Sequence, residues 1–297
     1  AGFIGSHLVD ALLERGDEVV VLDNFSSGKE ENLNLKNPRL KLIRGDVRSR
    51  EDVQEAIQGV EAVIHEAAIV SVPFSVKHPK ITHEVNVDGT RSVLEVCVEQ
   101  GVRRFVFASS CAVYGDTSVV PTPETVPPNP LTPYAKSKEL AERECLKFWK
   151  EEGLPVVVLR YFNVYGPRQS QGEYAGVMVK FKERIMQNQP PLIYGDGNQT
   201  RDFVFVKDVV RATLSALDRL PEGEIINIGS GVRTTINQLC EIFLKASGRR
   251  DLSPLYLPPR PGDILHSCAD ITKARRLLDF KPEVPLEEGV KTLFRMG

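Results

Sequence analysis

Two side chains four residues apart, Tyr134 and Lys138, form a pair that could carry out acid–base chemistry. On a helix they would lie one turn apart on the same face. An ammonium beside a phenol stabilises the phenolate, so we expect Lys138 to lower the pKa of Tyr134 from its ordinary value near ~10. Such a tyrosine can take a proton from a sugar hydroxyl. Tyr-x-x-x-Lys also occurs by chance on many helices, so the pair needs support from the rest of the chain.

That support comes from two serines, Ser109 and Ser110, which follow the apolar run at residues 103–108. We expect this run to be a strand that delivers both serines at its C-terminal end. Ligands of open parallel sheets bind at those ends. A serine hydroxyl there would complete a proton path with Tyr134.

The start of the chain predicts a dinucleotide site. Gly2, Phe3, Ile4 and Gly5 form a glycine turn that leads into an apolar helical pattern ending near Gly16. The N–H groups and positive dipole end of such a helix suit a pyrophosphate. Residues 18–23 then read as a buried strand ending in a carboxylate.

We interpret Asp23 as the acid that hydrogen-bonds the adenosine ribose, which favours NAD over NADP because it repels a 2′-phosphate. Asp23 could instead be only a turn residue before Asn24. A strand would be expected before the glycine turn, and the sequence contains none. We therefore expect this sequence to lack the first strand and one or two glycines.

Further strands alternate with helices. We expect strands at residues 39–47, 62–68, 103–108 and 155–163, and long helices at 85–100 and 134–152. This alternation is typical of a Rossmann-type, doubly wound parallel α/β sheet. Asp46 could meet the adenine or cap the helix at 50–58, and Ala67 and Ala68 are small where a dinucleotide would pass. His65 is interpreted as a packed histidine at a strand end.

After residue 166 the pattern changes to longer loops with recurrent prolines. We expect an NAD-binding domain at 1–166 and a smaller substrate-binding lid, mainly at 167–297. Segments near 203–230 are expected to return to the first domain. Arg201 and Arg260 lie in two separate loops of this half and suit a substrate diphosphate, because guanidinium matches phosphate geometry. Each could equally be a solvated surface arginine.

Composition limits the other function classes. The 297 residues are 41% hydrophobic and 26% charged, which is enough for a full core, and the net charge of −2 argues against a nucleic-acid partner. No apolar run approaches the ~20 residues that span a bilayer, and nothing resembles a signal peptide, so we expect a cytoplasmic protein without a membrane partner. The cysteines are scattered and lack metal-ligand spacing, so no metal site is expected; they are Cys97, Cys111, Cys145, Cys240 and Cys268.

These motifs together resemble one family. Gly-Phe-Ile-Gly at 2–5, Leu-Asp-Asn-Phe-Ser-Ser-Gly at 22–28, Ser-Ser-Cys-Ala-Val-Tyr-Gly at 109–115 and Pro-Tyr-Ala-Lys-Ser-Lys at 133–138 occur in the family's order. So do Arg-Tyr-Phe-Asn-Val-Tyr-Gly-Pro-Arg at 160–168, Gln-Thr-Arg-Asp-Phe-Val at 199–204 and Arg-Pro-Gly-Asp at 260–263. The chain resembles the extended short-chain dehydrogenase/reductases, specifically the NAD-dependent nucleotide-sugar epimerases.

The resemblance implies site residues. Tyr134 is the implied catalytic base, with Lys138 and Ser110 as its partners. The implied NAD-binding residues are Gly2, Phe3, Ile4, Gly5, Asp23, Asn24, Asp46, Val47, Ala67, Ala68, Asn86, Ser109, Tyr134, Lys138 and Tyr161. The implied substrate-binding residues are Ser110, Tyr134, Asn163, Arg201, Arg260, Asp263 and Ser267.

The reaction type is predicted from the residues after Ser110. Dehydratases and decarboxylases of the group need an acid there, whereas this chain has Cys111 and Ala112. We therefore expect a 4-epimerase of UDP-hexoses that oxidises the sugar transiently at its fourth carbon. A small residue at Ser267, where the family places a gate, should also admit N-acetylated UDP-sugars.

The resemblance also implies a homodimer, in which the helices at 85–100 and 134–152 of each chain form a four-helix interface. Two alternatives remain for the function. One is another nucleotide-sugar-modifying enzyme of the same fold, a reductase or a 4,6-dehydratase. The other is a non-catalytic NAD-sensing regulator, which has no reason to keep Ser110, Tyr134 and Lys138 together.

Overall fold

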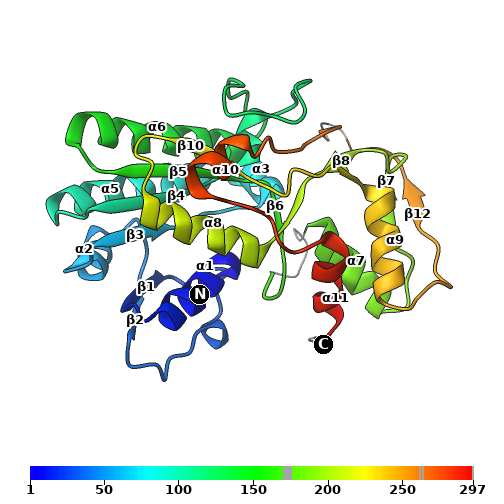
Figure 1. The fold of residues 1–297 in the computed structure, drawn as a ribbon, viewed down its shortest axis with the longest axis horizontal. Coiled ribbons are helices and arrows are strands. Elements are labelled where there is room, and N and C mark those ends of the chain that lie inside the picture. Colours follow the sequence, from blue (N-terminus) through cyan, green and yellow to red (C-terminus); the bar gives the residue numbers. More distant parts are fainter. Residues whose placement is uncertain (170–175, 261, 263, 296–297) are drawn as a thin grey trace.

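The computed structural model describes residues 1–169, 176–260, 262 and 264–295. Its centre is a four-stranded parallel sheet in the order β10-β5-β4-β3 (Figure 1). The strands are β3 (Ala62–His65), β4 (Arg104–Ser110), β5 (Val156–Tyr161) and β10 (Ile225–Ile228). The α/β fold with a parallel sheet predicted from the sequence is confirmed. β10 joins the sheet beside β5, although about 60 residues of the second half of the chain lie between them.

The first two predicted strands form a separate parallel pair, β1 (Val19–Asp23) with β2 (Leu40–Arg44). Within the described residues, no strand hydrogen-bonds this pair to β3. The helix α1 (Phe3–Arg15) covers the pair and packs against α8 (Val206–Arg219) (Figure 1).

Helices cover both faces of the central sheet because successive side chains of each strand point to opposite faces. Phe105 and Phe107 of β4 pack with α2 (Arg50–Ile57), α5 (Gly89–Glu99) and α6 (Pro133–Glu152). Val106 and Ala108 of the same strand pack on the other side with α8 and α10 (Thr272–Leu278). The sheet is thus buried on both faces, as expected for a doubly wound fold.

Two predicted helices carry the site and its neighbours. α6 begins where Thr132 accepts a hydrogen bond from the Ala135 N–H, with Pro133 in the first turn, and it ends at Gly153 in a left-handed conformation. The helix expected at 85–100 is observed as a π-type turn, η2 (Glu84–Asp88), followed by α5.

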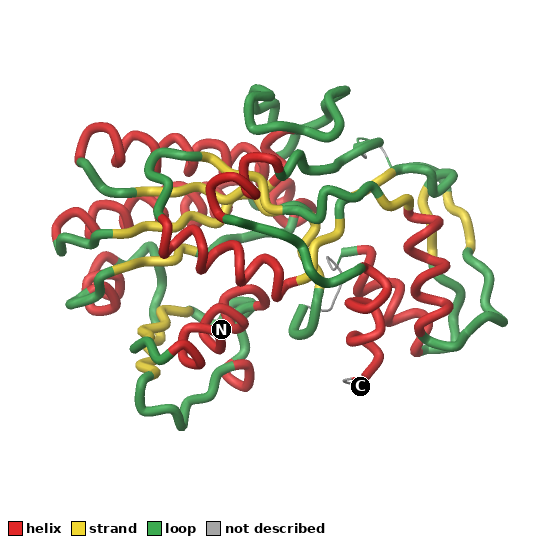
Figure 2. Tube along the Cα trace, in the orientation of Figure 1, coloured by secondary structure: helices red, strands yellow, loops and turns green. Residues whose placement is uncertain are grey.

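A smaller lobe lies beside the sheet. It contains α7 (Val177–Met186), α9 (Ile236–Ala246) and α11 (Leu286–Arg295), with β7 (Leu192–Tyr194) paired to β12 (Leu255–Leu257) (Figure 2). Edge-to-face contacts between Phe181, Phe243 and Phe294 lie in its core.

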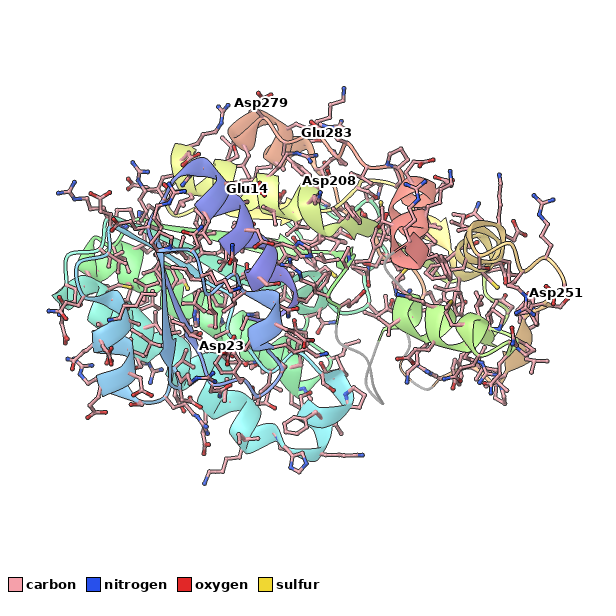
Figure 3. All side chains as sticks on the ribbon, turned by 90° about the horizontal axis from the view of Figure 1, so that it is seen from below. Glu14, Asp23, Asp208, Asp251, Asp279 and Glu283 are labelled. Atoms are coloured by element: carbon pink, nitrogen blue, oxygen red, sulfur yellow. The ribbon has the colours of Figure 1, made fainter. Side chains whose placement is uncertain are left out.

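Short elements connect the two lobes. β6 (Asn163–Tyr165) pairs with β9 (Phe203–Phe205), and β8 (Thr200–Arg201) pairs with β11 (Thr234–Thr235). Asp208 of α8 is buried and accepts hydrogen bonds from the N–H groups of Glu283 and Val284, both at 3.2 Å. Figure 3 shows Asp208 and Glu283 close together, where α8 meets the segment that leads to α11.

The remaining short elements are η1 (Glu30–Asn32), α3 (Val72–Lys77), α4 (Pro79–His83) and η3 (Cys111–Tyr114). In the part of the chain that the structure describes, no helix combines the length and the apolar character required to cross a membrane.

Candidate active site

The three residues proposed for catalysis come together at the C-terminal edge of the sheet. Ser110 ends β4, and Tyr134 and Lys138 lie one turn apart near the start of α6. The Ser110 hydroxyl hydrogen-bonds the Tyr134 phenol. Lys138 is buried, and its Nζ lies 4.4 Å from the centre of the Phe107 ring. A cation over an aromatic face is stabilised by the ring quadrupole.

The predicted effect of Lys138 on Tyr134 is wrong for the protein alone. Burial raises the pKa of Tyr134 to about 12, and the Ser110 hydrogen bond lowers it only in part. The negative forms of Cys111 and Glu66 would raise it further. Burial also lowers the pKa of Lys138 to about 8, so its charge is itself costly. The sequence spacing is correct, but burial and the groups around the phenol, and not Lys138, determine this pKa.

A pocket opens beside Ser110 and contains most of the predicted substrate residues. Ser110, Asn163, Arg201 and Ser267 all line it, together with Tyr161. No carboxylate occurs among the described residues that line it. Cys111 also lines the pocket and hydrogen-bonds Ser267, and burial raises the pKa of its thiol to about 11. Residues more than 150 positions apart in the chain therefore share one cavity.

Arg201 and Asn163 are held by backbone groups at the joint of the two lobes. An Nη of Arg201 donates to the Thr200 carbonyl at 2.9 Å, and the Asn163 amide donates to the Asp202 carbonyl at 3.2 Å. The predicted partner Arg260 is placed differently, because its guanidinium lies 3.8 Å from the centre of the Tyr194 ring.

Among the described residues that line the pocket, Arg260 is absent. The predicted Asp263 lies outside the described residues.

The dinucleotide positions predicted at the start of the chain flank the N-terminus of α1. Gly2 is the N-cap, no acidic residue occupies the first turn, and Phe3, Ile4 and Gly5 form that turn. A Cβ added at Gly2 or Gly5 would meet no atom within 4 Å, so the space beside this helix end is open. The residues here fit a pyrophosphate on the helix N-terminus. Asp23 ends β1, and Figure 3 shows it near α1.

Asn24 and Asp46 are joined by a 2.8 Å hydrogen bond across the ends of β1 and β2. Arg48 donates to both carboxylate oxygens of Asp46, at 2.9 and 2.8 Å, and holds its pKa well below the ordinary range. Asp46 therefore lies in the turn before α2, but Ser49 caps that helix by accepting a hydrogen bond from the Asp52 N–H, so the alternative prediction that Asp46 is the cap is wrong. Val47 is buried against Gly89 of α5.

Asn86 fixes the loop that follows β3. Its Oδ1 accepts from the Ile69 N–H at 2.7 Å, and its Nδ2 donates to the Ile69 carbonyl and to Ser137, both at 2.9 Å. Ala67 and Ala68 lie at the start of this loop and are partly buried. The amide of Asn86 thus shapes the backbone that would pass beside a dinucleotide.

Ser109 has an internal partner. Its hydroxyl donates to buried Glu142 of α6, which also accepts two hydrogen bonds from Arg160 of β5. The Ser109 hydroxyl is therefore hydrogen-bonded within this cluster. The predicted contact of Ser109 with NAD stays a prediction. His65 is packed, as predicted, and bonds Thr90 at 3.0 Å.

Three residues near the site were missed by the sequence reasoning. Glu66 follows β3, and its Oε1 lies within hydrogen-bond distance of the Tyr161 hydroxyl, at 3.0 Å. His266 lines the pocket and bonds Thr200 at 3.0 Å. Only for Glu66 did a signal exist, since a carboxylate follows a predicted strand at the edge where ligands bind.

The third, Asp202, is fully buried. Its carboxylate accepts from the N–H groups of Ser230 at 2.6 Å, Gly231 at 2.9 Å and Ala269 at 3.0 Å. It thereby holds together the loops that carry Arg201 and Ser267. Because all three donors are distant in sequence, no local signal could have identified this role.

Comparison with known proteins gives consistent results. Residues 1–229 match the model of the NAD dependent epimerase/dehydratase family. The crystal structure of UDP-glucose 4-epimerase from Thermotoga maritima with UDP-glucose is similar, with 42% identity and a TM-score of 0.95 over 100% of this chain and 96% of that chain. UDP-N-acetylglucosamine 4-epimerase from Methanobrevibacter ruminantium has 38% identity and a TM-score of 0.94, over 100% and 96%.

A relative with a different reaction matches at comparable identity. UDP-N-acetyl-alpha-D-glucosaminuronate decarboxylase from Bacillus cytotoxicus is 35% identical, over 98% of this chain and 93% of that protein. Family membership therefore establishes NAD dependence and chemistry on nucleotide sugars, and leaves open which reaction follows. The chain belongs to the NAD-dependent epimerase/dehydratase family, within the extended short-chain dehydrogenase/reductases.

Proposed function

We propose that this chain is a 4-epimerase of UDP-hexoses. The observation that carries the proposal is the composition of the pocket, where Ser110 is followed by Cys111 and Ala112 and no described lining residue is a carboxylate. A dehydratase or decarboxylase needs an acid near the sugar to protonate or eliminate. A thiol with a pKa of about 11 is a poor substitute.

In the proposed reaction, Tyr134 takes the proton of the sugar's 4-hydroxyl while Ser110 holds the phenol and the hydroxyl in line. When bound, oxidised NAD supplies a hydride acceptor beside the sugar's fourth carbon and a positive charge that favours the ionised form of Tyr134. The 4-keto sugar turns over in the pocket and presents its other face. Return of the hydride to that face, as Tyr134 gives back the proton, would leave no net redox change.

Arg201 and Asn163 are proposed to hold the diphosphate, so that the sugar can turn while the nucleotide stays in place. Their position at the pocket wall supports this role. The smaller lobe would act as a lid over the nucleotide. Ser267 is small and faces the same pocket, which supports acceptance of N-acetylated sugars. Ser267→Tyr should lower activity on UDP-N-acetylglucosamine more than on UDP-glucose, and an unchanged ratio would exclude this role.

The deciding experiment is incubation of the purified protein with UDP-glucose and UDP-N-acetylglucosamine, followed by chromatographic detection of the 4-epimers. Tyr134→Phe should lower kcat by about 10²–10⁴-fold, because the proton acceptor is lost, and should leave NAD bound. Tyr256→Phe on the exposed strand β12 is the matched control and should keep full activity. Full activity of Tyr134→Phe would overturn the assignment. Net NADH or a dehydrated product would instead indicate a reductase or a dehydratase.

A homodimer through α5 and α6 is also proposed. The two helices pack side by side on one face of the sheet (Figure 1), which supports their pairing with the same helices of a second copy. Sedimentation equilibrium should give twice the mass of one chain. A monomer at micromolar concentration would exclude the interface.

A further inference from the structure

Glu66 takes part in a hydrogen-bond chain that the proposed reaction does not use. Its Oε1 lies 3.0 Å from the Tyr161 hydroxyl, and that hydroxyl lies 2.8 Å from Oγ1 of Thr213. Oγ1 of Thr213 in turn lies 2.8 Å from the carbonyl oxygen of Val209, one turn earlier on α8. The chain therefore joins the end of β3, the end of β5 and the interior of α8.

The protons of this chain can be counted. Three oxygen–oxygen contacts have hydrogen-bond length, and each needs one hydrogen. The Tyr161 and Thr213 hydroxyls carry one each, and the Val209 carbonyl carries none. If Thr213 donates to Val209 and Tyr161 donates to Thr213, the contact between Tyr161 and Glu66 needs a hydrogen from Glu66. An ionised Glu66 would leave one contact with lone pairs facing each other.

We propose that Glu66 is a neutral carboxylic acid that acts as a positioning residue for Tyr134: it fixes the Tyr161 hydroxyl and keeps a second negative charge away from the phenol until its proton is lost at higher pH. The role in turnover rests on the proposed function. The protonation state of Glu66 does not.

The surroundings of Glu66 support this state. Burial raises its pKa to about 7, against the opposing effects of the Tyr161 hydrogen bond and the Lys138 ammonium. β5 contributes Tyr161, α6 contributes Lys138 and Tyr134, and α8 contributes the neutral Thr213. Beside it on β3, burial lowers the pKa of His65 to about 3, so that ring is neutral.

Ionisation of Glu66 has a definite consequence for the catalytic pair. A carboxylate at this position raises the pKa of Tyr134 and also that of Lys138. When Glu66 loses its proton, the Tyr134 phenol therefore ionises only at higher pH, and Lys138 stays protonated to higher pH. As pH rises through neutrality, the ionisation of Glu66 opposes the ionisation of Tyr134.

Glu66→Gln separates charge from shape. The amide of glutamine has one acceptor oxygen and a donor N–H₂, so it can donate to Tyr161 as the protonated acid does, without titrating. In protein labelled with ¹³C at glutamate Cδ, the resonance lost in this variant identifies Glu66. We expect its titration midpoint near pH 7. A midpoint below pH 5 would overturn the proposal, whether or not the protein epimerises any sugar.

A second variant tests the chain itself and covers a failure of the first to fold. In Thr213→Val the Tyr161 hydroxyl loses its acceptor on α8 and can donate to Glu66. The carboxylate gains a donor, so the Glu66 midpoint should move to lower pH. An unchanged midpoint would show that the chain does not determine the protonation state.

The effect on Tyr134 is read in two ways. With tyrosine labelled at ¹³Cζ, the Tyr134 phenol should titrate at lower pH in Glu66→Gln than in the parent protein. With UDP-glucose as substrate, the ratio of kcat for Glu66→Gln to kcat for the parent should rise between pH 6 and pH 8. Glu55 on α2 is a surface residue paired with Lys41. Glu55→Gln is therefore the control and should leave the Tyr134 titration and the pH dependence of kcat unchanged. Identical Tyr134 titrations in the two proteins would overturn the positioning role, and an inactive parent protein would overturn only the proposed function.

Discussion

Two glutamates act on Lys138, the buried Glu142 and the partly buried Glu66, and they are held in opposite ways. Glu142 accepts two hydrogen bonds from the Arg160 guanidinium, at 2.9 and 2.7 Å, and a third from Ser109. Its side chain is 4% exposed and that of Arg160 is 2% exposed. Glu66 has no cation within ion-pair distance among the described residues, and its polar partner is the Tyr161 hydroxyl. The two carboxylates therefore differ in their partners: Glu142 faces a guanidinium cation and Glu66 faces hydroxyls.

The two arrangements suit different tasks. The Glu142 cluster connects α6, β5 and β4, which deliver Tyr134, Tyr161 and Ser110 to the site. A bidentate guanidinium–carboxylate pair fixes geometry as well as charge. Glu66 connects the same edge through hydroxyls, which can reverse their donor roles when a proton is lost. One glutamate therefore holds the site in place, and the other can respond to pH.

The largest expected effect comes from breaking the fixed pair. Glu142→Gln leaves the Arg160 cation buried without its counter-charge and should lower the free energy of unfolding by about 3–5 kcal/mol. Urea unfolding at pH 7 measures this loss. A loss below about 1 kcal/mol would mean that Arg160 finds other compensation and that the comparison is wrong.

Removing both charges sharpens the same comparison. In the double variant Glu142→Leu with Arg160→Met, neither charge of this pair is left buried, and apolar side chains of similar size often replace such pairs without net cost. The double variant should therefore be more stable than Glu142→Gln alone. If it is less stable, the pair contributes through its geometry and not only through mutual neutralisation.

Glu66→Gln should raise the free energy of unfolding, in contrast to Glu142→Gln, and the gain should depend on pH. The pKa of Glu66 is about 7 in the folded protein and ordinarily 4.5, so the folded state binds more protons between these values. The stability contribution is fully present below pH 4.5 and is lost as pH rises through 7. The shift corresponds to about 3 kcal/mol.

The glutamine variant lacks this loss. It should match the parent protein near pH 4 and exceed its stability by up to about 3 kcal/mol above pH 7. Urea midpoints of both proteins across this range measure the difference. Parallel curves would show that Glu66 ionises in the folded protein as easily as in the unfolded chain.

The elements of the sheet could be predicted because their signals are local. Apolar runs of strand length at residues 103–108 and 155–163 identified β4 and β5, and parallel strands end at one edge. The meeting of Ser110 with Tyr134 followed from that rule. The separation of β1 and β2 from the central sheet is a matter of pairing between distant segments, and no single run encodes it.

The electrostatics of the site could not be predicted in the same way. The raised pKa of Tyr134 results mainly from burial, and the ammonium one turn away on α6 is not among its causes. The partners of Glu66, Tyr161 and Thr213, lie 95 and 147 residues further along the chain. The sequence prediction assigned a common substrate site to Asn163, Arg201 and Ser267 only through the resemblance to a family. Spacing along one helix gives geometry, whereas desolvation depends on the whole fold.

The smallest loss of stability is expected at a surface ion pair that has the same bidentate geometry as Glu142 with Arg160. Arg91 of α5 binds both oxygens of Glu144 on α6, at 3.0 and 2.9 Å, but the two side chains are 46% and 18% exposed. Arg91 lowers the pKa of Glu144, so its contribution is present at neutral pH and is lost as pH falls below the ordinary value of 4.5. Solvent screening limits that contribution to about 0–1 kcal/mol.

Glu144→Gln should therefore cost about 1 kcal/mol or less at pH 7, and added salt should reduce the cost further. Urea unfolding at two salt concentrations measures it against the loss in Glu142→Gln. The same pair lies on the two helices proposed to face a second copy. If the dimer buries it, the cost of Glu144→Gln will exceed the surface value and will depend on protein concentration, because water is then excluded from this pair as it is from Glu142 and Arg160.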